Sequence, residues 1–552
     1  MNRFILFTIA LTLMQNAFSQ EVEFNLQRGE VKRDKITKRT FGIESLGYDG
    51  EFAYFLYLPY QAVFDETSIG GMQNHLIARF DRDLNEVGKQ EIILENDNRK
   101  RTFHGVSLAK NRLYLFSAFQ NEEHKKHYLF VQTINKETLL PEDNMRKIGE
   151  IDYSGVNKYY ETQFHQELSP DSTKILVYYN LVNKDDENIR YGMYVYSSDM
   201  ELIWKKEHVV PEISGGVFSF QRFRIDNEGN VYLKGTNFTD LDNYYETAAF
   251  KDREFFSKDI FYADVPNYVT QLYRFSADGT QQHVNISLPD KFVRSLTFLP
   301  EADGALFCAG VWSDPGTISA RGTFTCALDF NSKKISQLNS MEFGQDMIEL
   351  GFDEKELQKF RKSIDNKQEW DPFDYLLSDV MSTGNGDKYF VAEQYIRGTK
   401  IEKSGHMITY RSIFLHNDLF VTRLNEDNSI GKIQKISKRQ YGPTVDHFNS
   451  YALLEKENHL YFAFMEIMKK NTMLKNAEPG NTYLVELSEA GSITKSVIPE
   501  VEAKNRLFLL PGTGMQVWDH ELIYSTITTN FKDYSVEKII LTPNYVASVP
   551  VE

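Results

Sequence analysis

The chain has 552 residues, of which 41% are apolar and 14% are aromatic, and this composition excludes a disordered protein. The formal net charge of −16 argues against a nucleic-acid-binding protein, which needs a basic surface to contact phosphates. Two cysteines are too few for a disulfide scaffold or a multi-cysteine metal site. Length alone suggests about three or four domains, although all-β architectures often extend further as a single domain.

The N-terminal segment has the organisation of a signal peptide. Arg3 supplies a positive charge, and the run from Phe4 to Leu13 is apolar but too short to span a bilayer. Small residues at Ala17 and Ser19 are typical of a cleavage site before residue 20. We therefore expect residues 1–19 to be removed and the mature chain to be exported to the periplasm, the cell surface or the medium. No later stretch is apolar enough to predict a transmembrane segment.

A repeated pattern runs through the rest of the chain. One unit is a polar turn followed by a short strand rich in Val, Ile, Tyr and Phe. A second unit follows it and consists of a strand, a tight polar turn and another strand, with turn centres such as Asp-Gly, Asn-Ser and Ala-Gly. The strand of the first unit recurs at 51–58, 112–119, 174–180, 230–236, 305–312, 388–396, 459–466 and 521–529.

Together the two units predict a four-stranded meander that repeats eight times, which is the pattern of a β-propeller. The mean spacing of about 67 residues exceeds the roughly 40–50 residues of propeller repeats, so the excess must lie in insertions. The last strand, 534–542, lacks a hairpin partner, and residues 21–33 are a candidate strand to close the ring. We therefore expect an all-β fold, with a single closed propeller over residues 20–552. Eight blades are favoured, and seven are the alternative.

One segment carries a resemblance to known propellers. The sequence LSPDSTKILVYY at 168–179 resembles the S-P-D-G repeat of TolB-like and WD-repeat propellers, with Ser172 in the glycine position. The sequence LPEADGALFCAG at 299–310 is a looser copy. The resemblance covers about a dozen residues per blade. It implies the propeller architecture and implies no activity, because one fold serves many functions.

The long connections fall into two classes of the meander. Segments 60–74, 181–190, 237–267, 398–417 and 467–481 join the second strand to the third, and segment 344–374 joins two blades. Both classes lie on the same face of a propeller, because antiparallel neighbours alternate in direction. Connections of this length without a β pattern are usually functional or disordered. We therefore predict that all six insertions project from a single face and that this face carries the activity.

Insertion 237–267 alternates aromatic residues with acids. Aromatic rings beside carboxylates suit stacking on sugar rings or gripping a peptide, although they can also pack a loop onto the propeller rim. The predicted ligand-binding residues are Tyr244, Tyr245, Phe255, Phe256 and Tyr262. The same insertion holds a candidate calcium site at Asp240, Asp242 and Glu246, and a second candidate lies at Asp185, Asp186 and Glu187. Neither matches the twelve-residue calcium loop, and no other cofactor is expected.

Insertion 344–374 contains a predicted helix. Asp353 followed by Glu356 forms a capping box, and Leu357, Phe360 and Ile364 follow with helical spacing as one apolar stripe. Such a helix could cover the mouth of the channel as a lid, or it could dock on a blade.

Catalytic motifs are absent from the sequence, which has no nucleophile elbow, zinc-protease motif or phosphate loop. His124 and His127 have a spacing that can share a zinc ion, and a solvated turn is the alternative. Cys308 and Cys326 are predicted on adjacent strands of the fifth blade, facing each other. A cross-strand disulfide is compatible with an oxidising compartment, and free buried thiols are the alternative.

Two functions are compatible with these patterns. The first is an exported binding or scaffold propeller of a bacterial cell envelope, which holds a protein or glycan on its insertion-rich face. The second is a carbohydrate-active enzyme, a glycoside hydrolase or lyase, with carboxylates at the channel mouth. The absence of catalytic motifs favours the first, so we lean toward a protein that is not an enzyme.

Overall fold

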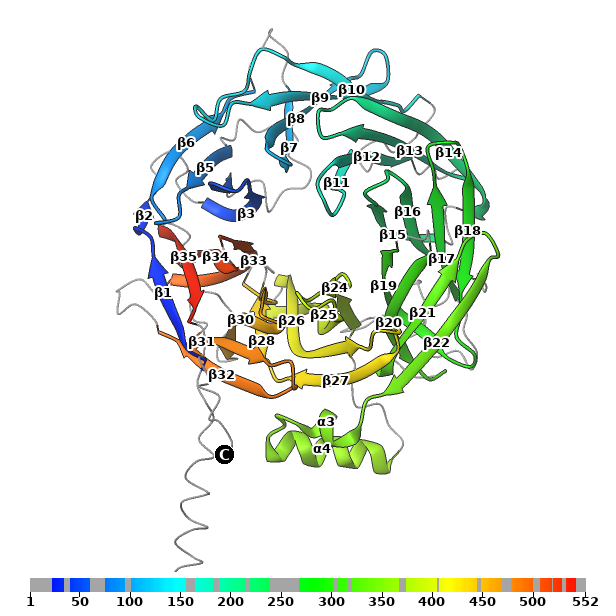
Figure 1. Ribbon diagram of the computed structural model, residues 1–552, viewed down its shortest axis with the longest axis vertical. Coiled ribbons are helices and arrows are strands. Elements are labelled where there is room, and N and C mark those ends of the chain that lie inside the picture. The colour runs from blue at the N-terminus through cyan, green and yellow to red at the C-terminus, as the bar shows by residue number, and fades with distance from the viewer. Residues whose placement is uncertain are drawn as a thin grey trace, which may run out of the picture.

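The computed structural model describes most of the chain between residues 22 and 542. The described ranges are 22–33, 40–59, 75–94, 101–154, 164–181, 188–214, 218–238, 268–301, 305–315, 320–366, 374–404, 407–443, 448–468, 478–499, 507–518, 520–528 and 533–542. Within these ranges the strands form eight separate sheets arranged around a ring (Figure 1). The protein is therefore an all-β propeller with eight blades, as predicted, and the seven-bladed alternative is wrong.

The first four blades are regular meanders, with strands a to d running from the ring axis outward. Blade one consists of β3 (Thr40–Tyr48), β4 (Ala53–Pro59), β5 (His75–Phe80) and β6 (Glu86–Ile92). Blade two consists of β7 (Thr102–Ala109), β8 (Arg112–Asn121), β9 (Lys126–Ile134) and β10 (Arg146–Asp152). Blade three consists of β11 (His165–Leu168), β12 (Lys174–Leu181), β13 (Asn188–Ser197) and β14 (Leu202–Ser214). Blade four consists of β15 (Phe218–Ile225), β16 (Val231–Phe238), β17 (Tyr268–Phe275) and β18 (Gln281–Ile286).

Blades five to seven continue the same order. Blade five consists of β19 (Phe292–Pro300), β20 (Leu306–Ser313), β21 (Ala320–Asp329) and β22 (Lys334–Glu342). Blade six has a divided first strand, β23 (Asp374–Leu377) and β24 (Met381–Ser382), followed by β25 (Lys388–Ser404), β26 (Met407–Leu424), β27 (Ile430–Ile436) and β28 (Gln440–Pro443). Blade seven consists of β29 (Ala452–Lys456), β30 (His459–Met468), β31 (Glu478–Leu487) and β32 (Ile493–Ile498).

Blade eight is completed by the N-terminal end of the described chain. Its strands β33 (Leu507–Val517), β34 (Glu521–Thr528) and β35 (Asp533–Leu541) come from the C-terminal end. The outer positions are filled by β1 (Phe24–Arg28) and β2 (Lys32–Arg33), which both pair with β35 (Figure 1). The prediction that residues 21–33 close the ring is confirmed for the described part of that segment.

Burial follows the position of a strand within its blade. All eight residues of β20 are buried, because the middle strands of a blade are covered on both faces by the neighbouring blades. The outer strand β22 is mostly exposed. Close packing also selects small residues, since a Cβ at Gly192 would lie 2.0 Å from the ring of Tyr179. Apolar burial between blades is the main stabilising contribution, at roughly 25 cal/mol per Å².

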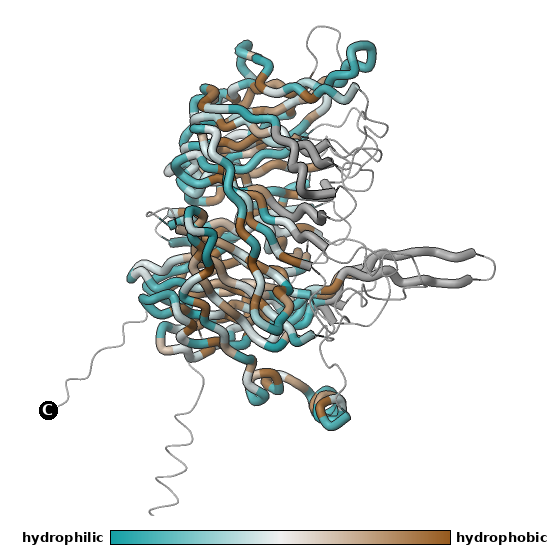
Figure 2. Tube along the Cα trace, turned by 90° about the vertical axis from the view of Figure 1, so that its right-hand side faces the viewer, coloured by the Kyte–Doolittle hydropathy of each residue, from teal (hydrophilic) through white to brown (hydrophobic). Residues whose placement is uncertain are grey.

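The inserted segment after blade five forms two helices, α3 (Gln345–Glu349) and α4 (Glu354–Asp365), which lie outside the ring beyond β22 and β27 (Figure 1 and Figure 2). The capping box of Asp353 and Glu356 is confirmed, with bonds of 2.7 and 3.0 Å. Lys435 anchors α3 by donating from Nζ to the carbonyl oxygen of Ile348 at 2.7 Å. The helices therefore dock on blades and do not form a lid.

Two details of the predicted insertions differ in the structure. The apolar stripe of α4 is only partly buried, because Phe360 packs inward whereas Ile364 is 40% exposed. The segment 398–417 is not an irregular loop, since β25 and β26 pair along it as far as Ser404 and Met407. Blade six therefore extends as a two-stranded ribbon. Most of the other long connections, including all of 239–267, lie outside the described residues, so the prediction of one elaborated face stays a prediction.

Cys308 and Cys326 occupy directly opposite positions on β20 and β21, as predicted. Both are buried and both are thiols in the structure. Burial raises the pKa of the Cys308 thiol, which slows oxidation because the thiolate is the reactive form.

If the protein is exported to an oxidising compartment, as residues 1–19 predict, we expect a Cys308–Cys326 disulfide to form there, because the register places the two residues directly opposite each other. Protein purified without reductant, denatured and treated with iodoacetamide should then show no alkylation by mass spectrometry. A reduced sample is the control and should gain two labels. Two labels without prior reduction would contradict the disulfide and support free thiols.

Candidate functional site

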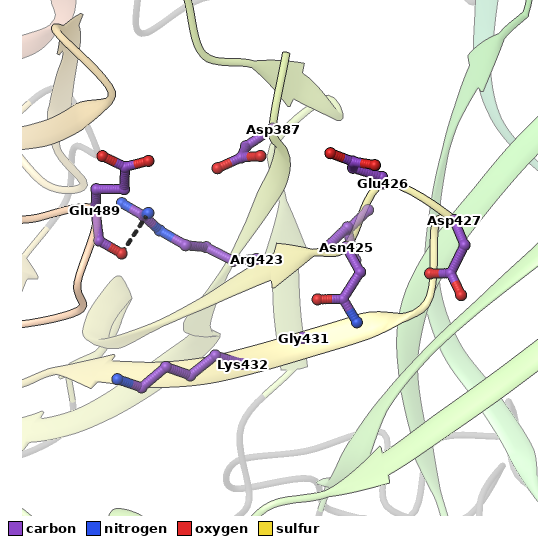
Figure 3. Close-up of a pocket in the computed structure, with 9 residues that line it drawn as sticks. Asp387, Arg423, Asn425, Glu426, Asp427, Gly431, Lys432 and Glu489 are labelled. Atoms are coloured by element: carbon purple, nitrogen blue, oxygen red, sulfur yellow. Dashed lines mark hydrogen bonds between the residues drawn. The ribbon is translucent and has the colours of Figure 1, made fainter. Parts of the chain in front are cut away.

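A polar pocket with a volume of about 670 Å³ opens between blades six and seven (Figure 3). Its residues come from the a–b and c–d turns and from the strand ends beside them, so it lies on the face opposite the predicted insertions. The lining residues are Asp387, Arg423, Leu424, Asn425, Glu426, Asp427, Gly431, Lys432 and Glu489.

The pocket is built by three turns with the same backbone geometry, at 383–387, 425–429 and 488–492. In each, the first residue donates its N–H to the carbonyl of the fifth, and the fourth donates back to the first, at 2.8 to 3.0 Å. The fourth residue has a left-handed conformation, with φ of 92° at Gly386, 64° at Asn428 and 88° at Gly491. Glycine and asparagine tolerate that conformation, which explains why these residues form tight hairpins here.

Arg423 ties the two blades together across the pocket. Its guanidinium donates to the carbonyl oxygens of Ser488 and Glu489, both at 2.9 Å, and of Asn458 at 3.3 Å. Burial lowers the pKa of Arg423, while the nearby carboxylates oppose that shift. Because three carbonyls of blade seven hold it, Arg423 serves mainly to fix the relative position of the turns.

Four carboxylates border the same space, from Asp387, Glu426, Asp427 and Glu489 (Figure 3). Asn385 links two of them, since its amide donates to Glu489 at 3.1 Å and to Asp387 at 3.2 Å. Hydrogen bonds from Ser429 lower the pKa of Asp427. Opposite them, Lys432 donates to the carbonyl of Ala490 at 3.4 Å. Such a surface suits ligands with hydroxyl or cationic groups.

A second cluster of titratable residues lies between blades two and three. His104, His127 and His165 stand near the starts of β7, β9 and β11, at the end of the blades from which the b–c and d–a connections leave. His104 occupies a β-bulge, and its Nε2 lies 2.6 Å from the carbonyl oxygen of Phe164. Because a carbonyl only accepts, Nε2 carries the proton and Nδ1 is the free base.

These histidines are held in the neutral form. Burial lowers the pKa of His104 and of His127 to about 4, and repulsion between the two rings adds to the shift for His127. Burial also lowers the pKa of His165, which stacks on Tyr178 at 5.1 Å. With a pKa of about 4, His104 and His127 are unprotonated at neutral pH but are weak bases, and the three rings also serve as packing between blades.

Most of the site residues that the sequence predicts lie in parts of the chain that the structure does not describe. Tyr244, Tyr245, Phe255, Phe256, Tyr262 and the calcium candidates Asp240, Asp242, Glu246, Asp185, Asp186 and Glu187 all lie outside the described residues. Of the histidine pair, His124 is exposed in a turn and His127 is half-buried. Within the ranges that the structure describes, no group of three His, Cys, Asp or Glu residues could hold a metal ion.

Sequence reasoning missed the pocket between blades six and seven. The available signal was the repetition of acidic turn sequences, GNGD at 384–387, NEDNS at 425–429 and SEAGS at 488–492. Their convergence required the positions of consecutive blades, which local patterns do not report.

The chain is similar to solved propeller structures, but at low sequence identity. No family model matches the chain, and no curated protein matches it. The Dos1 propeller is 10% identical with a TM-score of 0.42, over 94% of this chain and 96% of that one. The polysaccharide lyase Uly1 is 10% identical with a TM-score of 0.36, over 91% and 99%. The propeller domain of the Trilobed protease from Pyrococcus furiosus is 10% identical with a TM-score of 0.31, over 85% and 94%. Similarities of this size assign no activity.

We expect His104 and His127 to destabilise the protein as the pH falls. Their pKa of about 4 lies below the ordinary value near 6.5, so between these pH values the unfolded chain binds more protons than the folded one. The free energy of unfolding should therefore fall as the pH drops from 6.5 to 4. Urea denaturation of H104Q/H127Q should show a smaller loss over this window than the unchanged protein. A matched H124Q variant should behave like the unchanged protein, and equal losses in all three would contradict the assignment.

Proposed function

We propose that this protein is an exported binding or scaffold propeller of a bacterial cell envelope, which holds a protein or glycan partner. The observation that carries the proposal is the pocket between blades six and seven, whose walls are fixed by three turns of the same backbone geometry and by Arg423. Preorganised walls favour binding, because little conformational entropy is lost when a partner docks.

The chemistry of the pocket suits either class of partner. Carboxylates accept hydrogen bonds from vicinal hydroxyls of a glycan, and they pair with the basic side chains of a protein. Export is supported by the features of residues 1–19, which lie outside the described residues. Among the described residues, no helix is long and apolar enough to cross a membrane. Attachment to the envelope would then rest on the partner.

The test is capture of a partner from native envelope by cross-linking and pull-down. The triple variant D387N/E426Q/E489Q should capture at least about tenfold less partner than the unchanged protein. The reason is that a few central contacts, here those of the pocket carboxylates, carry most of the binding energy. The matched control is E122Q/E123Q, which removes charge from an exposed turn of blade two, and its capture should be unchanged.

A third variant tests the face predicted from the sequence. Deletion of 239–265 should abolish capture if the aromatic insertion holds the partner, and circular dichroism should show a folded propeller. If the triple variant and the deletion both capture normally, the binding proposal is wrong.

The second candidate is a carbohydrate-active enzyme, and one observation favours it. His104 has its Nε2 proton held by a carbonyl, so that a neutral Nδ1 could serve as a base. This geometry supports a lyase or hydrolase whose site lies on the face from which the b–c and d–a connections leave. The proposal also keeps the carboxylates at the channel mouth that the sequence suggested.

Incubation with a broad glycan panel tests the enzymatic alternative. Turnover should appear for at least one glycan and fall at least about a hundredfold in H104Q, as expected for loss of a general base. The H124Q variant is the matched control. No turnover of any glycan by the unchanged protein would count against an enzyme and in favour of binding.

A further inference from the structure

The N-terminal segment 22–33 docks on blade eight like a bound peptide. Its strand β1 pairs with β35 from Phe24 opposite Leu541 to Arg28 opposite Glu537, and β2 continues the pairing opposite Tyr534 and Asp533. It occupies the outermost position of the blade (Figure 1). Without it, the three strands β33, β34 and β35 still form one sheet between blades one and seven, with a free edge.

Apolar side chains enter the blade at alternate positions of the segment. Val22 is 6% exposed and belongs to the core cluster between blades seven and eight, against which Phe24 and Leu26 also pack. The intervening Glu23 and Asn25 are exposed. A peptide that adds to the edge of a sheet is recognised in this way. Its main-chain hydrogen bonds supply affinity, and the side chains at every second position supply specificity.

Basic residues of the segment meet acids that blade eight buries. Arg33 donates to both oxygens of Asp533 at 2.6 and 3.0 Å, and Arg28 lies 3.5 Å from Glu537. Asp533 is 7% exposed and Glu537 is 6% exposed. These acids would lose their arginine partners if the segment left. The edge of β35 that the segment covers therefore selects for arginine at two positions.

Polar contacts hold the segment at its start, middle and end. The backbone N–H of Val22 donates to Ser496 Oγ at 2.6 Å, and that of Gly29 donates to the carbonyl of Val536 at 2.8 Å. Lys32 lies 3.1 Å from Glu86 of blade one. The segment therefore touches blades one, seven and eight, which are the places where the ring is joined.

We propose that blade eight is a strand-acceptor site, and that residues 22–33 are a detachable latch which occupies it and closes an otherwise folded ring. The ligand class of the site is an extended peptide with apolar residues at alternate positions followed by arginine. The occupant in the intact protein is the chain's own N-terminal segment. This inference is independent of the proposed function, since it concerns neither the pocket nor the histidines.

The test uses the mature chain, residues 20–552, with a protease recognition sequence inserted between Arg33 and Thr40. After cleavage, the nicked protein should retain its N-terminal segment on size-exclusion chromatography. A fluorescein-labelled synthetic peptide of residues 20–33 should then replace it under native conditions, with no change in circular dichroism. Replacement that occurs only as fast as global unfolding would overturn the proposal.

Peptide variants test the recognition rule. Peptides carrying Leu26→Ser or Arg28→Ala should need at least about a tenfold higher concentration to compete. Leu26 packs against the core between blades seven and eight, and Arg28 pairs with the buried Glu537. The matched control, Asn25→Ala, changes an exposed residue and should compete normally. Equal competition by all peptides, or by a scrambled peptide, would show that the site has no such specificity.

A measurement on the uncut mature chain tests the same proposal if the variant with the inserted cleavage site does not fold. Native-state hydrogen exchange should show the amides of β1 opening at a lower free energy than those shared by β34 and β35. Exchange of both sets at the same free energy would make the segment an ordinary structural strand and would overturn the latch.

Discussion

Packing of blade eight against blade one is the interaction on which the rest of this structure depends. A single blade exposes two apolar faces, and it is stable only between two neighbours. Closing the ring gives blades one and eight the neighbour that each would otherwise lack, and their shared cluster includes Phe55, Trp518 and Tyr534. Ion pairs cross the same junction, with Arg82 on Glu521 at 2.9 Å. This cluster forms without the N-terminal segment, which adds contacts on either side of blade eight through Lys32 on Glu86 and through Val22 in the core between blades seven and eight.

The ring architecture also decides where chemistry is placed. Middle strands such as β20 and β34 are wholly buried, which leaves turns, strand ends and connections to carry polar groups. Both candidate sites follow this rule. The pocket lies where turns of two blades approach, and the histidines lie where strands begin on the other face. The two ends of the blades thus offer different chemistry, acidic in the pocket and neutral imidazole between blades two and three.

The fold was largely predictable because its signals are local. Turn residues and alternating strands marked every blade, the unpaired strand 534–542 indicated closure from the N-terminus, and the capping box at Asp353 followed from a spacing of three. The ribbon at 398–417 was missed because its sequence lacks regular apolar alternation and its pairing extends beyond the core. Ile364 fits the helical period but is exposed, because α4 contacts the ring over a narrow surface that includes Phe360.

The sequence by itself determined the blade repeat and the facing positions of Cys308 and Cys326, since both depend on hydrogen-bond register within one hairpin or one meander. It also indicated the closing strand, because strand 534–542 has no hairpin partner after it. Only the tertiary structure decided which turns meet. Asp387 and Glu489 are about a hundred positions apart, and their approach depends on the rotation between blades six and seven and on the bonds from Arg423. The same holds for His104 beside Phe164, because contacts between blades are set by packing of whole sheets, which no local pattern encodes.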